Sequence, residues 1–457
     1  MIAGILGAGD RWRTRTTFVL ALSASAVGLG NLWRFSYLAG EHGGGAFVLT
    51  YVACLFLLAV PVLVAEVVIG HHGRAGPLRA WRHACDRSLV SRAWVGAGVL
   101  ACVTGLLILA LYVVVAGWAL AYVRYTYIGV FSAASAPEVA GQFERFVTDP
   151  LPQVYWQSLF LLLAGGAVVL GVRRGLGLLV WLAVPVLVAL LGYLVRFALD
   201  SGDTVRAGEF LFSTRLVDFT PASALVALGH AFFTLGVGVG TGIVYGAYAP
   251  ERIPIGRSVM AVAVFDTMIA LLAGLAIFPV VFANNLEPSM GPGLLFVSVP
   301  YAFGNLAQGE LFGALFFLLV VFAALGSAVA ILEPLVASLM QLARLERLTA
   351  ALIVGVLVWA LALLVTYSFT GGDAVRWYGK QNFFALFDRL GADVLLPLVS
   401  LLTALFVGWR LRPEILRRQL QRESPALVQV WRFLLRWPVP LAIALLLLAS
   451  LADGVSS

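Results

Sequence analysis

Long apolar runs occupy most of this chain and restrict it to helices that cross a membrane. The 457 residues are 61% hydrophobic and 12% charged. A run of about 20 apolar residues spans a bilayer as a helix, which satisfies its own backbone hydrogen bonds in lipid. We expect an all-α integral membrane protein, one transmembrane domain over residues 1–457, with eleven transmembrane helices. Their expected ranges are 16–38, 44–70, 93–124, 154–172, 176–199, 222–249, 257–285, 311–341, 348–369, 381–409 and 433–452.

Positive charge is concentrated in alternate loops. The net charge is +7, yet the segment 284–308 contains neither Lys nor Arg. Because basic loops stay in the cytoplasm, we expect a multi-pass protein of the cell inner (plasma) membrane, with a cytoplasmic N-terminus and an external C-terminus. The same distribution argues against a nucleic-acid partner. The residues that carry the pattern are Arg11, Arg13, Arg15, Arg74, Arg79, Arg82, Arg87, Arg92, Arg410, Arg412, Arg417, Arg418 and Arg422.

Glycine interrupts two of the expected helices. The first helix contains Gly28 and Gly30, and the sixth contains four glycines at alternate positions between 236 and 242. Each glycine costs about 1 kcal/mol relative to alanine in a helix, although close helix packing alone explains the sixth helix equally well. The two breaks occupy corresponding positions if residues 12–199 and 222–409 form a 5+5 inverted repeat, with 433–452 as an extra helix. Paired broken helices indicate a transporter with its binding site at mid-membrane.

With both breaks identified, the sequence resembles the neurotransmitter:sodium symporter family, especially its eleven-helix bacterial members. The most specific motif is the run from Ala26 to Phe35, and Gly43–Phe47 follows it. The resemblance implies sodium-driven amino-acid symport by alternating access, in a lipid bilayer, with Na⁺ and no organic cofactor. Further matching motifs are Phe232–Leu235, Asp266-Thr267, Gly274–Pro279, Gly291–Leu294, Ser327 and Glu333-Pro334.

The resemblance implies a first sodium site built from Ala26, Asn31, Thr234 and Asp266. An acid within a membrane helix is costly and therefore functional by default. Many relatives have asparagine at the position of Asp266, and the chloride-dependent animal members have serine at the position of Ala270. We expect Asp266 to supply the negative charge that chloride supplies there, which makes transport chloride-independent.

The implied second sodium site consists of the Ala24, Val27 and Ala323 carbonyls and the Ser327 hydroxyl. The chain departs from the family at Gly326, where a Thr, Ser or Asp usually adds another oxygen. The number of sodium ions, one or two, therefore stays open at this stage.

The resemblance also implies a substrate pocket with a mostly apolar wall. The Tyr112 hydroxyl and the amides freed near Leu29 and Gly30 are expected to bind the substrate carboxylate. An unpaired buried charge is costly, so we expect a neutral, hydrophobic amino acid. The expected lining residues are Ser25, Ala26, Leu29, Gly30, Ile108, Tyr112, Phe233, Thr234, Gly236, Val239, Ser327 and Ile331.

Gates are expected on both sides of this pocket. Arg34 and Asp388 form the expected outer gate, next to His230, which replaces the usual glutamine and titrates near neutral pH when unperturbed. On the inner side Trp12 is present. The arginine that usually precedes it is Gly9, and the usual acidic partner is Gln341.

Two alternatives remain at this stage. Gly326 and His230 are compatible with a proton-coupled amino-acid transporter of the same fold. A substrate sensor that does not pump is the second alternative. We do not expect an enzyme, because the loops contain no nucleophile–base set and the loop histidines lack metal-ligand spacing.

Overall fold

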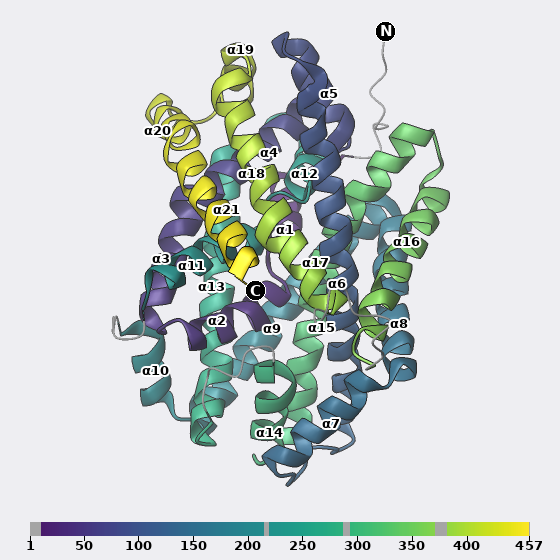
Figure 1. Cartoon of the computed structure of the whole chain (residues 1–457), viewed down its shortest axis with the longest axis vertical. Coiled ribbons are helices and arrows are strands. Elements are labelled where there is room, and N and C mark those ends of the chain that lie inside the picture. The colour runs from purple at the N-terminus through teal and green to yellow at the C-terminus, as the bar shows by residue number, and fades with distance from the viewer. Residues whose placement is uncertain (1–10, 214–218, 287–292, 371–381, 457) are drawn as a thin grey trace.

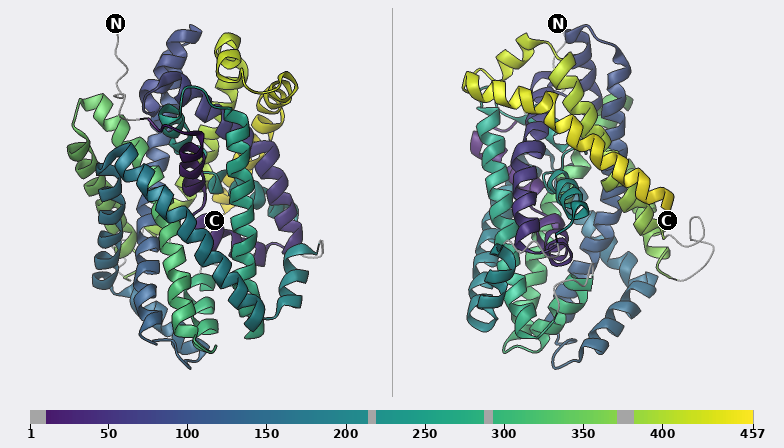
Figure 2. Two further views of the ribbon diagram at one scale, coloured as in Figure 1. Left: turned by 180° about the vertical axis from the view of Figure 1, so that it is seen from behind. Right: turned by 60° about the vertical axis from the view of Figure 1, so that its left-hand side comes forward.

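The computed structural model describes residues 11–213, 219–286, 293–370 and 382–456, with side chains described as far as residue 451. This part of the chain is helical and contains no strand. Figure 1 shows an elongated bundle of helices, and Figure 2 shows the same bundle from two further directions. The expected all-α membrane fold is therefore confirmed.

Nine helices in the described ranges are long and apolar enough to cross a membrane. Most of them agree with the expected ranges to within a few residues, although the last begins well before residue 433. They are Gly45–Gly73 (α3 to α4), Arg92–Tyr127 (with α6, Val95–Tyr127), Pro150–Val169 (α8), Val172–Ser201 (with α9, Leu178–Ser201), Ile255–Ala283 (α13), Gly309–Ala343 (α15), Arg347–Tyr367 (α16), Phe383–Arg410 (with α18, Leu396–Leu405) and Pro425–Leu451 (α20, Pro425–Arg436, and the first part of α21, Pro438–Ser456).

The first and sixth expected helices are each divided in two. α1 (Arg15–Ala26) is followed by a helical segment from Gly30 to Glu41, and the two are bent by 48°. They count as a tenth span if taken together. α11 (Pro221–Thr234) and α12 (Thr241–Tyr248) replace the expected helix 222–249. The expected total of eleven spans stays a prediction, because α11 and α12 are each too short to cross a membrane alone.

Short helices occupy several segments that we expected to be loops. α5 (Pro77–Ser88) is amphipathic, and it buries Trp81 while Arg82 and Arg87 lie outward. Hydropathy windows of membrane length do not detect such helices, because their mean hydropathy is low. The others are α7 (Ala136–Thr148), α10 (Thr204–Phe212), α14 (Val299–Gly304) and α19 (Pro413–Gln419).

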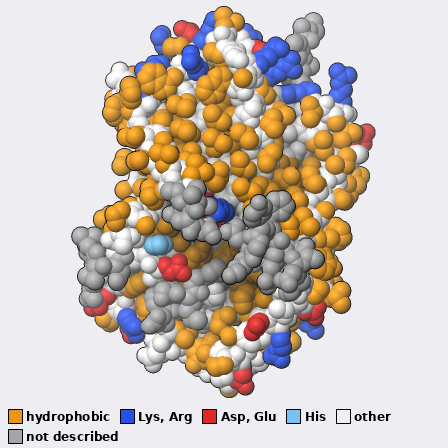
Figure 3. All heavy atoms as spheres, in the orientation of Figure 1, with side chains coloured by type: hydrophobic (Ala, Val, Ile, Leu, Met, Phe, Trp, Pro, Cys, Tyr) orange, Lys and Arg blue, Asp and Glu red, His pale blue; other side chains and the backbone are white. Residues whose placement is uncertain are grey.

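The core forms around α6 and α15, which pack along each other and contact α8 and α16. α1 packs against α13 and α15, and α12 packs against α4 (Val60–Gly73). In Figure 3, hydrophobic side chains cover most of the visible face, and Lys and Arg side chains gather at the end where α5 and α19 lie in Figure 1. The broken helices are thus enclosed by intact ones, which is the condition for an irregular backbone at membrane depth.

Candidate functional site

The first break frees backbone groups that side chains then bind. α1 ends at Ala26, and the helix resumes at Gly30. The Gly28 N–H donates to Asn31 Oδ1 at 3.0 Å, and the Leu29 N–H donates to the Tyr112 hydroxyl at 3.0 Å. A Cβ on Gly28 would lie only 2.5 Å from the Tyr112 hydroxyl oxygen. Glycine is therefore required for α6 to approach the break.

The second break depends on glycine conformation. Gly236, Gly238 and Gly240 have φ values of 60°, 87° and 81°, which L side chains rarely adopt. The Gly238 N–H donates to Glu66 Oε1 at 2.8 Å. A Cβ on Gly30 would lie 3.5 Å from the Phe233 ring, so the two breaks lie face to face. The glycines of the sixth helix thus unwind the backbone and do not merely allow close packing.

Asp266 lies on α13 at the centre of a buried polar cluster. Its carboxylate accepts hydrogen bonds from Asn31 Nδ2 (2.8 Å), the Tyr51 hydroxyl (3.1 Å) and the Thr234 hydroxyl (3.2 Å). Asp266, Asn31 and Tyr51 are fully buried. Asn31 and Thr234, both expected to bind the first sodium ion, therefore each lie within hydrogen-bond distance of Asp266, which is expected at the same site. The sequence analysis missed Tyr51, although a tyrosine in the middle of a membrane span needs a polar partner, as Tyr112 does.

Residues expected at the second sodium site meet where α15 crosses the first break. The Ser327 hydroxyl donates to the Val27 carbonyl at 3.2 Å. Gly326 faces the Ala24 carbonyl so closely that a Cβ there would lie 2.6 Å from its oxygen. Ala323 is buried one turn earlier on the same helix. Backbone oxygens therefore converge here with one hydroxyl, and Gly326 adds no side-chain oxygen.

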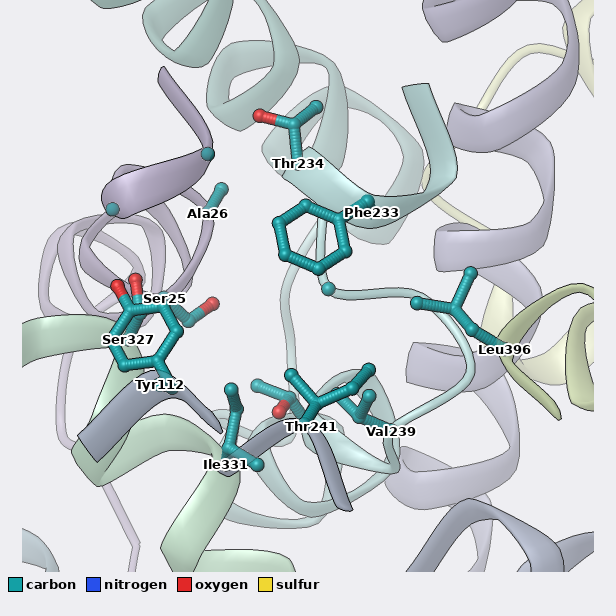
Figure 4. Close-up of a pocket in the computed structure, with 14 residues that line it drawn as sticks. Ser25, Ala26, Tyr112, Phe233, Thr234, Val239, Thr241, Ser327, Ile331 and Leu396 are labelled. Carbon is teal, nitrogen blue, oxygen red and sulfur yellow. The ribbon is translucent and has the colours of Figure 1, made fainter. Parts of the chain in front are cut away.

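A cavity lies between the two breaks and is lined by nearly all of the expected pocket residues (Figure 4). Only Leu29 is absent from its wall, and that residue lines a neighbouring cavity on the side of Arg34. Figure 4 shows the hydroxyls of Tyr112, Ser327 and Ser25 on one side, Thr234 and Phe233 on another, and Ile331, Thr241, Val239 and Leu396 around the rest. The sequence analysis missed three lining residues: Gly28, Thr241 and Leu396.

Arg34 lies between the pocket and a larger cavity of about 520 Å³. Its guanidinium lies 3.4 Å from an Asp388 oxygen and 4.5 Å from the centre of the Phe233 ring. Asp393, which the sequence analysis did not select, lies 3.8 Å from the same guanidinium. Arg34 and Asp388 are thus placed to close the pocket as the expected gate would.

His230 lines the same outer cavity and is almost completely buried. Its ring packs against Phe35, Phe47 and Tyr51, and the Tyr51 ring centroid is 5.1 Å away. Neither ring nitrogen has a hydrogen-bond partner within the described residues. His230 therefore contacts Tyr51, which donates a hydrogen bond to Asp266. His230 also forms part of the wall of the larger cavity.

On the expected inner side, aromatic side chains pack around Trp12. Trp12 is 3% exposed, and its backbone N–H donates to the Tyr248 carbonyl at 3.0 Å. Its ring packs edge-on against Tyr245 and Tyr248. Arg11 forms an ion pair with Glu251 at 2.9 Å.

Gly9 and Gln341 differ from the family pattern on the expected inner side, and the structure describes one of these two positions. Gln341 accepts a hydrogen bond from the Gly76 N–H at 3.1 Å and so contacts the start of α5. Gly9 lies outside the described residues. Glu333 is buried and pairs with Arg347 at 2.8 Å and with the Tyr248 hydroxyl.

The sequence matches the model of the sodium:neurotransmitter symporter family over residues 9–133 and 150–456. The chain belongs to this family. Among curated relatives of this symporter, a protein of Bacillus subtilis named uncharacterized sodium-dependent transporter YhdH is 33% identical over 441 residues, 96% of this chain and 97% of the relative. The sodium- and chloride-dependent GABA transporter 2 of Mus musculus is 26% identical, over 88% of this chain and 73% of that protein. The crystal structure of MhsT in complex with L-phenylalanine matches with a TM-score of 0.88 and 35% identity, over 96% of this chain and 99% of that one.

Membership of the symporter family has direct consequences for function. The protein is a multi-pass membrane protein that carries out sodium-dependent secondary transport. The expectations of family and fold are confirmed, and so is the expectation that the chain is not an enzyme. The roles of individual residues stay predictions, which the geometry above makes testable.

Proposed function

We propose that this symporter imports a neutral, hydrophobic amino acid together with sodium, by alternating access. The observation that carries the proposal is the division of the pocket between the breaks. Hydroxyls of Tyr112, Ser327 and Ser25 lie on one side, and the remaining wall is mostly apolar. Its two threonine hydroxyls are already bonded, Thr234 to Asp266 and Thr241 to the Ala330 carbonyl. Among the described lining residues, Tyr112 alone has an ionisable side chain. An amino-acid backbone matches the polar side, and a charged substrate side chain would be left without a partner.

The pocket holds about 30 Å³ in this structure, and we propose that it widens beside Gly236 and Val239 to admit a bulky substrate side chain. Gly236 contributes no side chain to the wall, and Val239 contributes a small one. A Cβ on Gly236 would have only the Val239 side chain within 4 Å. The related structure of MhsT contains L-phenylalanine, and this supports a bulky hydrophobic substrate here.

The sodium ions are assigned to the two groups of oxygens beside the first break. Ala26, Asn31, Thr234 and Asp266 hold the first ion, and the substrate carboxylate completes its shell. Ala24, Val27, Ala323 and Ser327 hold a second ion, which binds more weakly because Gly326 offers no oxygen. Asp266 supplies the negative charge at the first site, so transport does not require chloride.

The protein is assigned to the cell inner membrane, with the end that carries α5 and α19 in the cytoplasm. The gathering of Arg side chains at that end supports this orientation (Figure 3). The large cavity at Arg34 then opens to the outside, and Trp12 closes the path to the cytoplasm. This arrangement is suited to uptake from outside the cell.

Uptake into proteoliposomes tests the proposal. The purified protein is reconstituted, and radiolabelled leucine or phenylalanine is supplied under a sodium gradient alone or a proton gradient alone. We expect accumulation with sodium only, unchanged when gluconate replaces chloride. Uptake with a proton gradient in the absence of sodium would favour the proton-coupled alternative that His230 and Gly326 motivate.

Competition between amino acids tests the pocket. Unlabelled Leu, Met, Phe and Trp are expected to displace the labelled substrate at far lower concentrations than Lys, Arg, Asp and Glu. A charged amino acid that competes better than all four hydrophobic ones would refute the assignment of the pocket. A sensor that binds but does not pump would show competition without accumulation.

A further inference from the structure

Helix α20 presents three chemically different faces. One face is packed on the protein and buries Leu435 completely. A second face is apolar and exposed, with Leu427, Val430 and Phe433 each between 56% and 59% exposed. The third face is polar and consists of Gln429, Arg432 and Arg436. A helix with separate basic and lipid-facing sides is typical of the boundary between headgroups and acyl chains.

The placement of α20 in the fold agrees with this location. α20 lies at the same end of the molecule as α5 and α19, and α21 leaves it obliquely toward the middle (Figures 1 and 2). Next to it, Trp409 and Trp437 are 48% and 58% exposed, and their ring centroids are 5.1 Å apart. Exposed tryptophans are enriched at membrane–water interfaces. The positive-inside pattern assigns this interface to the cytoplasmic leaflet.

Three arginines form a cationic cluster on one side of α20. Arg432 and Arg436 are four residues apart on α20, so they lie on the same side of the helix. Arg417 of α19 is close enough for its charge to act on Arg432, as the charge of Arg436 does. The Nε of Arg432 is buried and has no hydrogen-bond partner in the described part of the chain. Arg436 is held in position, because its Nε donates to the Gly408 carbonyl at 2.8 Å and its guanidinium lies 5.2 Å from the Trp409 ring centre.

Acidic side chains do not neutralise this cluster. Within the ranges that the structure describes, Arg417, Arg432 and Arg436 make no salt bridge. Glu423, the acid just before α20, pairs instead with Arg257 at 3.4 Å. Like charges held together without a counter-ion repel each other. An anion from outside the protein would therefore bind favourably at this position.

We propose that Arg417, Arg432 and Arg436 bind the phosphate of an anionic phospholipid in the cytoplasmic leaflet. The bidentate donors of arginine suit a phosphate group. The acyl chains of the same lipid lie along the exposed apolar face of Leu427, Val430 and Phe433. A free anion would gain only the first of these contacts, so the lipid is the favoured occupant.

The test compares lipids on the purified, full-length protein. Thermal stability and lipid retention in native mass spectrometry are measured in nanodiscs of phosphatidylcholine alone, or with phosphatidylglycerol added. The variant carries Arg417→Gln and Arg432→Gln. The control carries Arg82→Gln and Arg87→Gln, which remove the same charge from exposed positions on α5. A further arm adds inorganic phosphate to the protein in phosphatidylcholine.

We expect phosphatidylglycerol to stabilise the wild type and the control, and to be retained by both. The cluster variant should bind it roughly thirtyfold more weakly, from the loss of two arginines at an anionic surface. Equal retention by variant and control would overturn the proposal, as would equal stabilisation by phosphatidylcholine or inorganic phosphate. If the double variant fails to fold, Arg417→Gln alone is used, because its side chain is exposed, and about a fivefold loss is expected.

Discussion

Replacing Asp266 by alanine should weaken sodium binding severely and make it depend on chloride. The carboxylate is the acceptor for Asn31, Tyr51 and Thr234, all of which lie in the buried cluster. Asp266→Ala removes the negative charge and leaves these three donors directed at the space that the carboxylate filled. Such a group of donors is suited to a halide ion, which would restore the missing charge.

The magnitude follows from the distances in the cluster. Thr234 Oγ1 lies 3.2 Å from the carboxylate, and an ion that both groups coordinate lies within about 4 Å of the negative charge. At an effective dielectric constant of about 20, a charge pair at about 4 Å contributes about 4 kcal/mol. Each 1.4 kcal/mol is about a tenfold change in affinity, so we expect sodium affinity to fall about a thousandfold without chloride.

The assay is sodium-dependent binding of a labelled amino acid to detergent-purified protein, in sodium gluconate and in sodium chloride. The control is Asp200→Ala, which breaks an exposed ion pair with Arg196 and should change little. Chloride should recover most of the lost affinity in the Asp266 variant and have no effect on wild type. Sodium affinity that stays within threefold of wild type in gluconate, in a folded Asp266→Ala protein, would refute the role of Asp266.

Three further variants test other parts of the site. Tyr112→Phe should reduce substrate affinity about fivefold to about 150-fold, from loss of a buried hydrogen bond worth about 1–3 kcal/mol; an unchanged dissociation constant would exclude contact with the carboxylate. Gly326→Ser should raise sodium affinity above that of Gly326→Ala, which adds the same Cβ 2.6 Å from the Ala24 oxygen but no hydroxyl; identical sodium curves would count against a second site. Glu333→Gln should destabilise the protein by about 3–5 kcal/mol, because Arg347 loses its buried partner; an unchanged melting temperature would contradict this estimate.

The breaks in the two helices could be predicted from sequence because glycine has a local cost in a helix. Gly28 and Gly30 interrupt an apolar run, and Gly236, Gly238 and Gly240 adopt positive φ values that end the helix there. The pocket then followed from the family resemblance, since part of its lining comes from short motifs around the same breaks and most of the rest from α6 and α15. Local pattern and family motif thus agreed at the centre of the molecule.

Features that depend on contacts between distant segments could not be predicted. Tyr51 and Asp266 are far apart in sequence, and only the packing of their helices brings the phenol to the carboxylate. The substitution at Gly326 was visible as a missing oxygen, but its approach to the Ala24 carbonyl was not. Leu396 and Thr241 belong to no family motif that the sequence analysis used, so their places in the pocket wall were missed.

The glycine at position 326 has a consequence for how steeply the cell can concentrate its substrate. A zwitterionic amino acid carries no net charge, so the membrane potential acts only on the accompanying ions. Each charge moved across about 100 mV supplies about 2.3 kcal/mol, which corresponds to roughly a 50-fold concentration ratio. With one ion per cycle, the membrane potential therefore limits the substrate concentration ratio to roughly 50-fold, and with two ions the limit is roughly 2,000-fold. In the proposed two-site arrangement, occupancy of the site beside Gly326 thus separates a transporter suited to abundant amino acids from one able to collect scarce ones.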